Sequence, residues 1–116
     1  MNQQHFYSQA ARWYDLNLDL NGYRRAARYI VRQLPFMDSD VLKVLDAGCG
    51  TGLYTLAILE RFPNACVDAF DLNPDMVEQA RKQIAKTGNL DRASVIVKDI
   101  TSDLPYSPRS FDLVIT

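Results

Sequence analysis

A glycine-rich turn is the part of this 116-residue sequence that points most directly to chemistry. Residues 44–52 read VLDAGCGTG, and they stand between an apolar run and a helical pattern. Glycine in such a turn lets the backbone bend sharply and lets a ligand approach main-chain atoms that a Cβ would block. Because an acidic residue also ends the next apolar run, the pattern predicts a site for a ligand that contains adenosine.

Asp46, directly before the glycines, indicates which adenosine ligand this is. A dinucleotide fingerprint has its third small residue inside the helix, where this chain has Leu53. A carboxylate at Asp46 would also repel the doubly charged pyrophosphate of a dinucleotide. S-adenosylmethionine has no phosphate, and its sulfonium and ammonium groups are attracted to a carboxylate. The sign of the charge therefore favours S-adenosylmethionine.

Two further acidic residues follow later apolar runs. Asp71 ends the second run and Asp99 follows the third. Ligands of open parallel sheets bind beyond the carboxyl ends of the strands, so we expect Asp71 to accept hydrogen bonds from ribose hydroxyls. Its alternative role as a helix N-cap competes with Asn73, which already fills that place. Asp99 is expected to accept from the adenine amino group while the N–H of Ile100 donates to the ring, and a loop-capping role is its alternative.

Strands that alternate with helices are expected to position these residues. Apolar runs predict strands at 41–45, 65–70, 94–97 and 111–116, and helical spacing predicts helices at 53–62 and from 74 to 88. This alternation is typical of a parallel sheet with right-handed crossovers. Leu72 and Met76 are placed to flank an adenine, although methionine at helical spacing is more often part of the core.

The first 40 residues are predicted to form an N-terminal helical cap. Its second helix carries an apolar stripe and ends at Pro35. Arginines recur every four residues on another face of this helix, and they form either a solvated face or a docking surface for an acidic partner. The stripe consists of Ala27, Ile30, Val31 and Leu34, and the arginines are Arg24, Arg28 and Arg32.

Composition excludes several functional classes. The net charge is −1, from 13 basic and 14 acidic residues, so no general attraction to nucleic acid or to an anionic membrane is expected. No apolar stretch approaches the roughly 20 residues of a membrane span, and the N-terminus does not resemble a signal peptide. Cys49 and Cys66 do not suggest a disulfide framework, and no zinc-ligand spacing is present. We therefore expect a cytoplasmic protein without a bound metal.

The successive motifs resemble those of a known enzyme family. VLDAGCGTG, FDLNPDM, VIVKDI and SFDLVIT are similar to the ordered motifs of class I, Rossmann-like S-adenosylmethionine-dependent methyltransferases, nearest to the ubiquinone/menaquinone-biosynthesis type. The resemblance implies an α/β fold: a three-layer, doubly wound parallel sheet preceded by N-terminal helices. It covers residues 41–116, which would form the cofactor-binding half-domain.

The resemblance also implies a role for individual residues. Asp46, Gly48, Cys49 and Gly50 would line the methionine and ribose. The ribose hydroxyls would bind Asp71, and the adenine would lie against Asp99 and Ile100. Thr116 would lie near the methionine amino group. Catalytic and acceptor-binding residues are expected beyond Thr116, where this family places them, so the sequence identifies none.

Length is where the chain departs from the family, whose sheets have seven strands in the order 3-2-1-4-5-7-6. This chain supplies strands 3-2-1-4 and ends within strand 4, so its 113–115 run becomes an apolar edge. We expect either a fragment of a longer protein or a homodimer through this edge. The predicted function is methyl transfer to a small-molecule acceptor, with little turnover by the 116 residues alone. The alternatives are a non-catalytic S-adenosylmethionine-binding module and a nicotinamide-dependent oxidoreductase.

Overall fold

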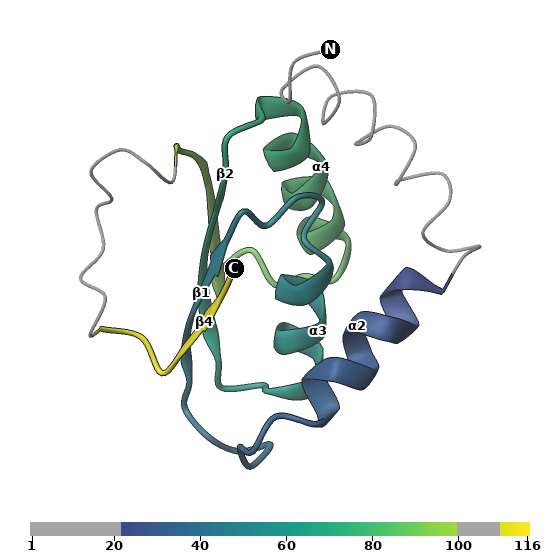
Figure 1. Ribbon diagram of the computed structural model, residues 1–116, viewed down its shortest axis with the longest axis vertical. Helices are drawn as coiled ribbons and strands as arrows, with labels where there is room; N and C mark the ends of the chain where they lie inside the picture. The colour runs from purple at the N-terminus through teal and green to yellow at the C-terminus, as the bar shows by residue number, and fades with distance from the viewer. Residues whose placement is uncertain (1–21, 100–109) are drawn as a thin grey trace.

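A four-stranded parallel sheet forms the centre of the molecule (Figure 1). The computed structural model describes residues 22–99 and 110–116. The strand order is β3-β2-β1-β4, which confirms the order predicted for a Rossmann-like half-sheet. The strands are β1 (Lys43–Ala47), β2 (Cys66–Asp71), β3 (Ala93–Val97) and β4 (Leu113–Ile115).

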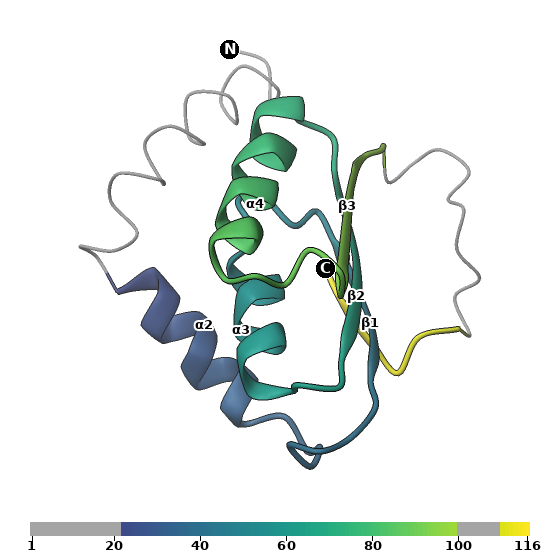
Figure 2. The same ribbon diagram turned by 180° about the vertical axis from the view of Figure 1, so that it is seen from behind.

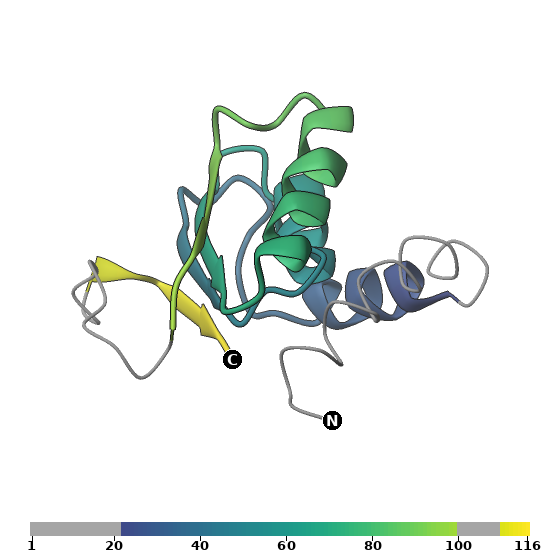
Figure 3. The same ribbon diagram turned by 90° about the horizontal axis from the view of Figure 1, so that it is seen from above.

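The helices of the described residues all lie on one side of this sheet, as Figures 1 and 2 show from opposite directions and Figure 3 shows from above. They are α2 (Tyr23–Arg32), α3 (Leu53–Arg61) and α4 (Pro74–Lys86). The chain steps from β1 to β2 to β3 in one direction, and right-handed crossovers then place α3 and α4 on the same face. The step from β3 to β4 reverses this direction. That connection falls largely at 100–109, outside the described residues, and the described part therefore supplies two layers.

The main core fills the space between the sheet and its helices. Alternate residues of the strands point toward α3 and α4, because successive side chains of a strand face opposite sides. The fully buried members include Val44, Val67, Ala69, Ile58, Phe62, Val77 and Ile84. On the other face, Leu45, Ala47 and Phe70 form a smaller cluster with Ile96 and Phe111.

Side chains close the ends of the helices. Asn73 caps α4, because its Oδ1 accepts from the N–H of Asp75 at 2.8 Å, and Pro74 follows as the first helical residue. This confirms the predicted start of the helix. At the end of α3, the guanidinium of Arg92 donates to the carbonyl oxygens of Leu59 and Phe62 at 3.0 Å each. The last carbonyls of a helix lack intrahelical partners, so these two bonds anchor the end of α3 to the segment before β3.

Several predicted boundaries were wrong by one or two residues. β1 begins at Lys43 rather than at Val41, whose side chain is 80% exposed, and β4 is shorter than the predicted 111–116. The apolar stripe of α2 was also wrong in part: Ala27 is buried, but Ile30 is 47% exposed. The reason is that α2 packs mainly on α3, so only a narrow face of α2 is covered.

The helix α2 shares the main core with the sheet. Ala27 and Val31 belong to the same buried cluster as Val44 of β1 and Ile58 of α3. The guanidinium of Arg61 also donates to the carbonyl oxygen of Val31 at 2.6 Å, which ties the end of α2 to α3. The predicted division into a cap over 1–40 and a half-domain over 41–116 stays a prediction, and the first predicted helix lies outside the described residues.

Candidate functional site

Most of the predicted site residues come together at the carboxyl edge of the sheet. Asp46 lies near the end of β1, Asp71 ends β2, and Asp99 lies two residues beyond β3. Thr116 follows β4, whose Ile115 is in register with Asp46. Because the strands are parallel, these four positions share one edge of the sheet. The order in which strands are added reverses between β1 and β4, and such sheets bind ligands at that point. Ile100 lies outside the described residues.

The carboxylate of Asp46 is held at the N-terminus of α3. Its side chain is 2% exposed, and the Oγ1 of Thr55 donates to its Oδ2 at 2.7 Å. The backbone N–H of Thr55 donates to the same carboxylate. Thr55 is the third residue of α3, so a protein carboxylate satisfies a donor that a helix N-terminus would otherwise offer to an anionic ligand.

Burial makes this carboxylate unusually easy to protonate. The pKa of Asp46 is raised from 3.8 to about 6, chiefly by desolvation and also by the charge of Asp71. The two hydrogen bonds from Thr55 act in the opposite direction, because they favour the ionised form. A cation bound nearby would also favour ionisation, so the site is electrostatically suited to a positively charged group.

Four N–H groups of the glycine turn are used within the protein. Four donor–acceptor pairs account for them: Gly48 N–H to the Phe70 carbonyl at 2.9 Å, Cys49 N–H to the same carbonyl at 2.9 Å, Gly50 N–H to Asp71 Oδ2 at 2.9 Å, and Gly52 N–H to the Cys49 carbonyl at 3.0 Å. In a dinucleotide turn, donors of this kind face the pyrophosphate. Here those four groups have protein acceptors, so these four donors are not directed at a phosphate.

Asp71 is oriented by backbone donors on both sides. Its Oδ2 accepts from Gly50 N–H at 2.9 Å, and its Oδ1 accepts from Asn73 N–H at 3.0 Å. Each carboxylate oxygen has more than one acceptor site, so these bonds fix the direction of the group and still allow it to accept from two hydroxyls. The side chain is half-buried, which leaves part of it accessible to a ligand.

Gly52 explains why the third glycine stands one position early. Its φ is +88°, and a Cβ placed on it would lie 3.2 Å from the Cβ of Ala80 on α4. The close packing that a dinucleotide fingerprint obtains inside its helix is therefore provided here at the N-cap of α3. Leu53, the next residue, is free to carry a large side chain.

Other predicted residues differ in how they can contribute. Leu72 is 43% exposed and Asp99 is exposed, so both have surface to offer a ligand. Met76 is 3% exposed, which places it in the core, as its alternative role predicted. Burial, together with the charges of Asp46 and Asp71, raises the pKa of the Cys49 thiol above its usual range. A thiol kept neutral in this way is a poor nucleophile, so Cys49 packs beside the turn rather than attacking a substrate.

Thr55 is the site residue that sequence reasoning missed. A hydroxyl in the first turn of the helix that follows the glycines was the available signal. Within the described residues, no group of three or more His, Cys, Asp or Glu side chains could hold a metal ion. No helix in the ranges 22–99 and 110–116 has the length and apolar character needed to cross a membrane.

Comparison with known proteins places this geometry in a family. The family described as methyltransferase domain matches residues 44–116. The chain is 39% identical over 72 residues to malonyl-[acyl-carrier protein] O-methyltransferase 1 from Ilyobacter polytropus, covering 61% of this chain and 25% of that protein. It is 32% identical over 112 residues to malonyl-[acyl-carrier protein] O-methyltransferase from Priestia megaterium, covering 95% of this chain and 38% of that protein.

A solved structure shares the fold. It is a protein from Methanococcus maripaludis assigned as an S-adenosyl-L-methionine-dependent methyltransferase, with a TM-score of 0.75 and 22% identity, and the match covers 98% of this chain and 51% of that one. The chain therefore spans about a quarter to two fifths of the two curated relatives described above and about half of this structural neighbour. Since the family match extends over more than half of the sequence, the chain belongs to the methyltransferase domain family.

Proposed function

We propose that the chain is the cofactor-binding part of an S-adenosylmethionine-dependent methyltransferase and that the carboxyl edge of its sheet binds this cofactor. The observation that carries the proposal is the Asp46 carboxylate at the N-terminus of α3. A dinucleotide-binding sheet accepts its pyrophosphate at that place, and a carboxylate there opposes a second anion. The same charge attracts a ligand that carries a sulfonium and an ammonium group.

Each residue of the edge has a proposed role. Asp71 accepts from the ribose hydroxyls, since its carboxylate is already oriented by Gly50 and Asn73. Asp46 provides negative charge near the methionine part without leaving the core. The remaining proposed contacts are Gly48, Cys49 and Gly50 with methionine and ribose, Leu72, Asp99 and Ile100 with adenine, and Thr116 with the methionine amino group.

The chemistry asks little of the protein beyond positioning. When bound, S-adenosylmethionine supplies a methyl group that its sulfonium already activates. The residues of this chain orient the cofactor and compensate its charge, and no proton transfer by Asp46 or Asp71 is required. We propose a small-molecule acceptor. Two relatives are named as O-methyltransferases of malonyl-[acyl-carrier protein], so an acyl group carried on a protein is the alternative acceptor.

Turnover is proposed to need more chain than these 116 residues, because they span 25% and 38% of the two curated relatives. We expect the chain alone to bind cofactor and to show little methyl transfer. The alternative of a non-catalytic S-adenosylmethionine-binding module rests on the same partial coverage. A methyl-transfer assay on the longer protein separates the two, since only a methyltransferase would convert S-adenosylmethionine to S-adenosylhomocysteine while methylating an acceptor. Cytoplasmic localisation and a homodimer through β4 remain proposals.

Calorimetric titration with S-adenosylmethionine, S-adenosylhomocysteine and NAD tests the cofactor. We expect both S-adenosyl compounds to bind and NAD to bind weakly or not at all. Asp71→Asn should weaken the binding of S-adenosylmethionine about tenfold or more, because a charged acceptor of ribose hydroxyls is lost. Asp91→Asn is the matched control, because Asp91 is exposed in the segment before β3, away from the edge. Tight NAD binding with no response to S-adenosylmethionine would overturn the proposal.

A further inference from the structure

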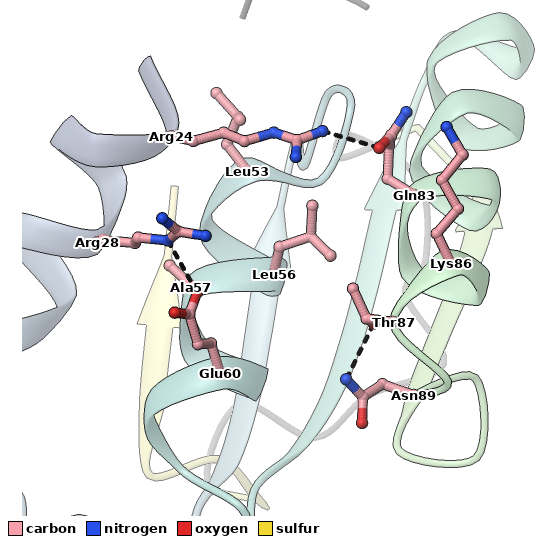
Figure 4. A pocket seen from close by; sticks show the side chains of 10 residues that line it. All are labelled: Arg24, Arg28, Leu53, Leu56, Ala57, Glu60, Gln83, Lys86, Thr87 and Asn89. Atoms are coloured by element: carbon pink, nitrogen blue, oxygen red, sulfur yellow. Dashed lines mark hydrogen bonds and ion pairs between the residues drawn. The ribbon is translucent and has the colours of Figure 1, made fainter. Parts of the chain in front are cut away.

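A cleft separate from the carboxyl edge of the sheet lies within the helix layer, on the side of α3 that faces away from the sheet. It has a volume of about 340 Å³ and lies between α2, α3 and the C-terminal end of α4 (Figure 4). The residues that line it do not include any that we assign to the cofactor. Two faces of α3 therefore line different sites. Thr55 points toward Asp46, while Leu53 and Leu56 point into this cleft.

Positive charge dominates the walls of the cleft. Arg24 and Arg28 come from α2 and Lys86 from the last turn of α4, whereas Glu60 is the one carboxylate among the described residues that line the cleft. Glu60 accepts from Arg28 at 2.8 Å, and Arg24 donates to the neutral amide oxygen of Gln83 at 2.8 Å. Figure 4 shows Arg24 reaching across from α2 to α4. With three cations and one anion among the described residues of its lining, the cleft is complementary to an anion.

The floor of the cleft is apolar. Leu53, Leu56 and Ala57 line it from α3, and Figure 4 shows Leu56 between the two charged walls. A bare inorganic anion would leave the apolar floor exposed to water. A neutral apolar molecule would give the cations of the lining no anionic group to bind. The volume is in the range of small-ligand pockets, which start at about 300 Å³. The lining therefore fits a molecule that has both an anionic head and a short apolar body.

We propose that this cleft is a binding site for a small organic anion, a carboxylate that carries a short hydrocarbon chain. The carboxylate lies between the α2 arginines and Lys86, and the chain covers Leu53 and Leu56. An acidic polypeptide docking on α2 would in addition use Arg25, which is exposed on the same helix and does not line the cleft. The site is independent of the proposed cofactor edge, so either can fail without the other.

Calorimetric titration of the intact protein with hexanoate tests the proposal. Hexanol has the same chain without the charge, and inorganic phosphate has charge without the chain. We expect saturable binding of hexanoate, weakened by added salt, and no comparable binding of the other two probes. Lys86→Gln and Arg28→Gln should each weaken hexanoate at least about fivefold, because each removes a charge-assisted contact.

Two matched variants keep the result specific. Lys82→Gln removes a lysine one turn earlier on α4, and Arg25→Gln removes an arginine of α2 outside the cleft. Both should bind hexanoate as the unchanged protein does, and circular dichroism should show all four variants folded. The proposal is overturned if hexanoate does not bind, if hexanol binds equally well, or if Lys86→Gln has no effect. Equal loss in Arg25→Gln and Arg28→Gln would instead indicate a diffuse basic surface for an acidic polypeptide.

Discussion

At the scale of single residues, Asp46 has both a structural and an electrostatic task. Its carboxylate accepts from the hydroxyl and the N–H of Thr55, and it therefore satisfies a donor in the first turn of α3. The same burial that allows this contact raises its pKa to about 6. The protein thus holds a desolvated carboxylate beside the turn, and a bound cation would stabilise its ionised form.

This raised pKa has a definite sign in the stability of the protein. The folded state holds the Asp46 proton more tightly than the unfolded state does, since the pKa is about 6 rather than 3.8. The corresponding stability is present below pH 3.8 and is lost as the pH rises through 6, amounting to about 3 kcal/mol. Urea unfolding of Asp46→Asn between pH 4 and 7 should lack this contribution. A variant with the same pH dependence as the unchanged protein would contradict the assignment.

The same proton should compete with the cofactor. If S-adenosylmethionine requires an ionised Asp46, its affinity should fall about tenfold for each pH unit below 6 and level off above pH 7. Titration calorimetry from pH 5 to 8 measures this profile. Asp46→Asn should bind weakly at every pH, and a profile that is flat in the unchanged protein would show that the carboxylate plays no part.

Thr55 should set the midpoint of that profile. Its hydroxyl donates to Asp46 at 2.7 Å and favours the ionised form. Thr55→Val removes this bond and should move the pH midpoint of cofactor affinity upward by about one to two units. Thr55→Ser keeps the hydroxyl and should keep the midpoint. A purely structural role for Thr55 would lower stability in the valine variant without moving the midpoint.

At the scale of elements, the distance between α3 and α4 depends on one glycine. Gly52 has a φ of +88°, and a Cβ there would meet Ala80 at 3.2 Å. Gly88 has a similar φ of +75°, but a Cβ there would meet nothing within 4 Å. The pair therefore separates the cost of the left-handed backbone from the cost of the helix contact.

We expect Gly52→Ala to destabilise the protein more than Gly88→Ala does. Both variants pay about 1–2 kcal/mol for the left-handed conformation, and only the first also forces α4 away from α3. Chemical denaturation measures both. Combining Gly52→Ala with Ala80→Gly should recover the excess, because the double variant restores the space. Equal losses in the two single variants would show that the helices adjust freely.

At the scale of the whole molecule, the sheet of the described residues ends at β4, which pairs with β1. Val114 of this strand is half-exposed. An apolar edge strand invites pairing with another chain. We expect the 116-residue chain to dimerise with rising concentration and Val114→Lys to shift it toward monomer, as analytical ultracentrifugation can measure. A concentration-independent monomer would contradict the proposed homodimer.

Much of the fold could be predicted because local sequence carries strong signals. The glycines after Asp46, the Asn73-Pro74 helix start and the acidic residue closing β2 were each readable without any contact being known. Strand ends were less accurate, because Val41 is as apolar as its neighbours and only its position beyond the sheet leaves it exposed. The stripe of α2 failed for a related reason: spacing identified an apolar face, but it could not show that α3 covers only part of it.

The sequence by itself determined the turn, the alternation of strands and helices and the sign of the charge beside the turn, because these depend on residue type and spacing along the chain. Tertiary structure decided that four N–H groups of the turn have protein acceptors, that Thr55 reaches Asp46, and that Gly52 meets Ala80. It also brought Arg24 and Arg28 of α2 and Lys86 of α4 around one cleft. These contacts join segments separated in the chain, and only the packing of helices on a twisted sheet determines which side chains meet.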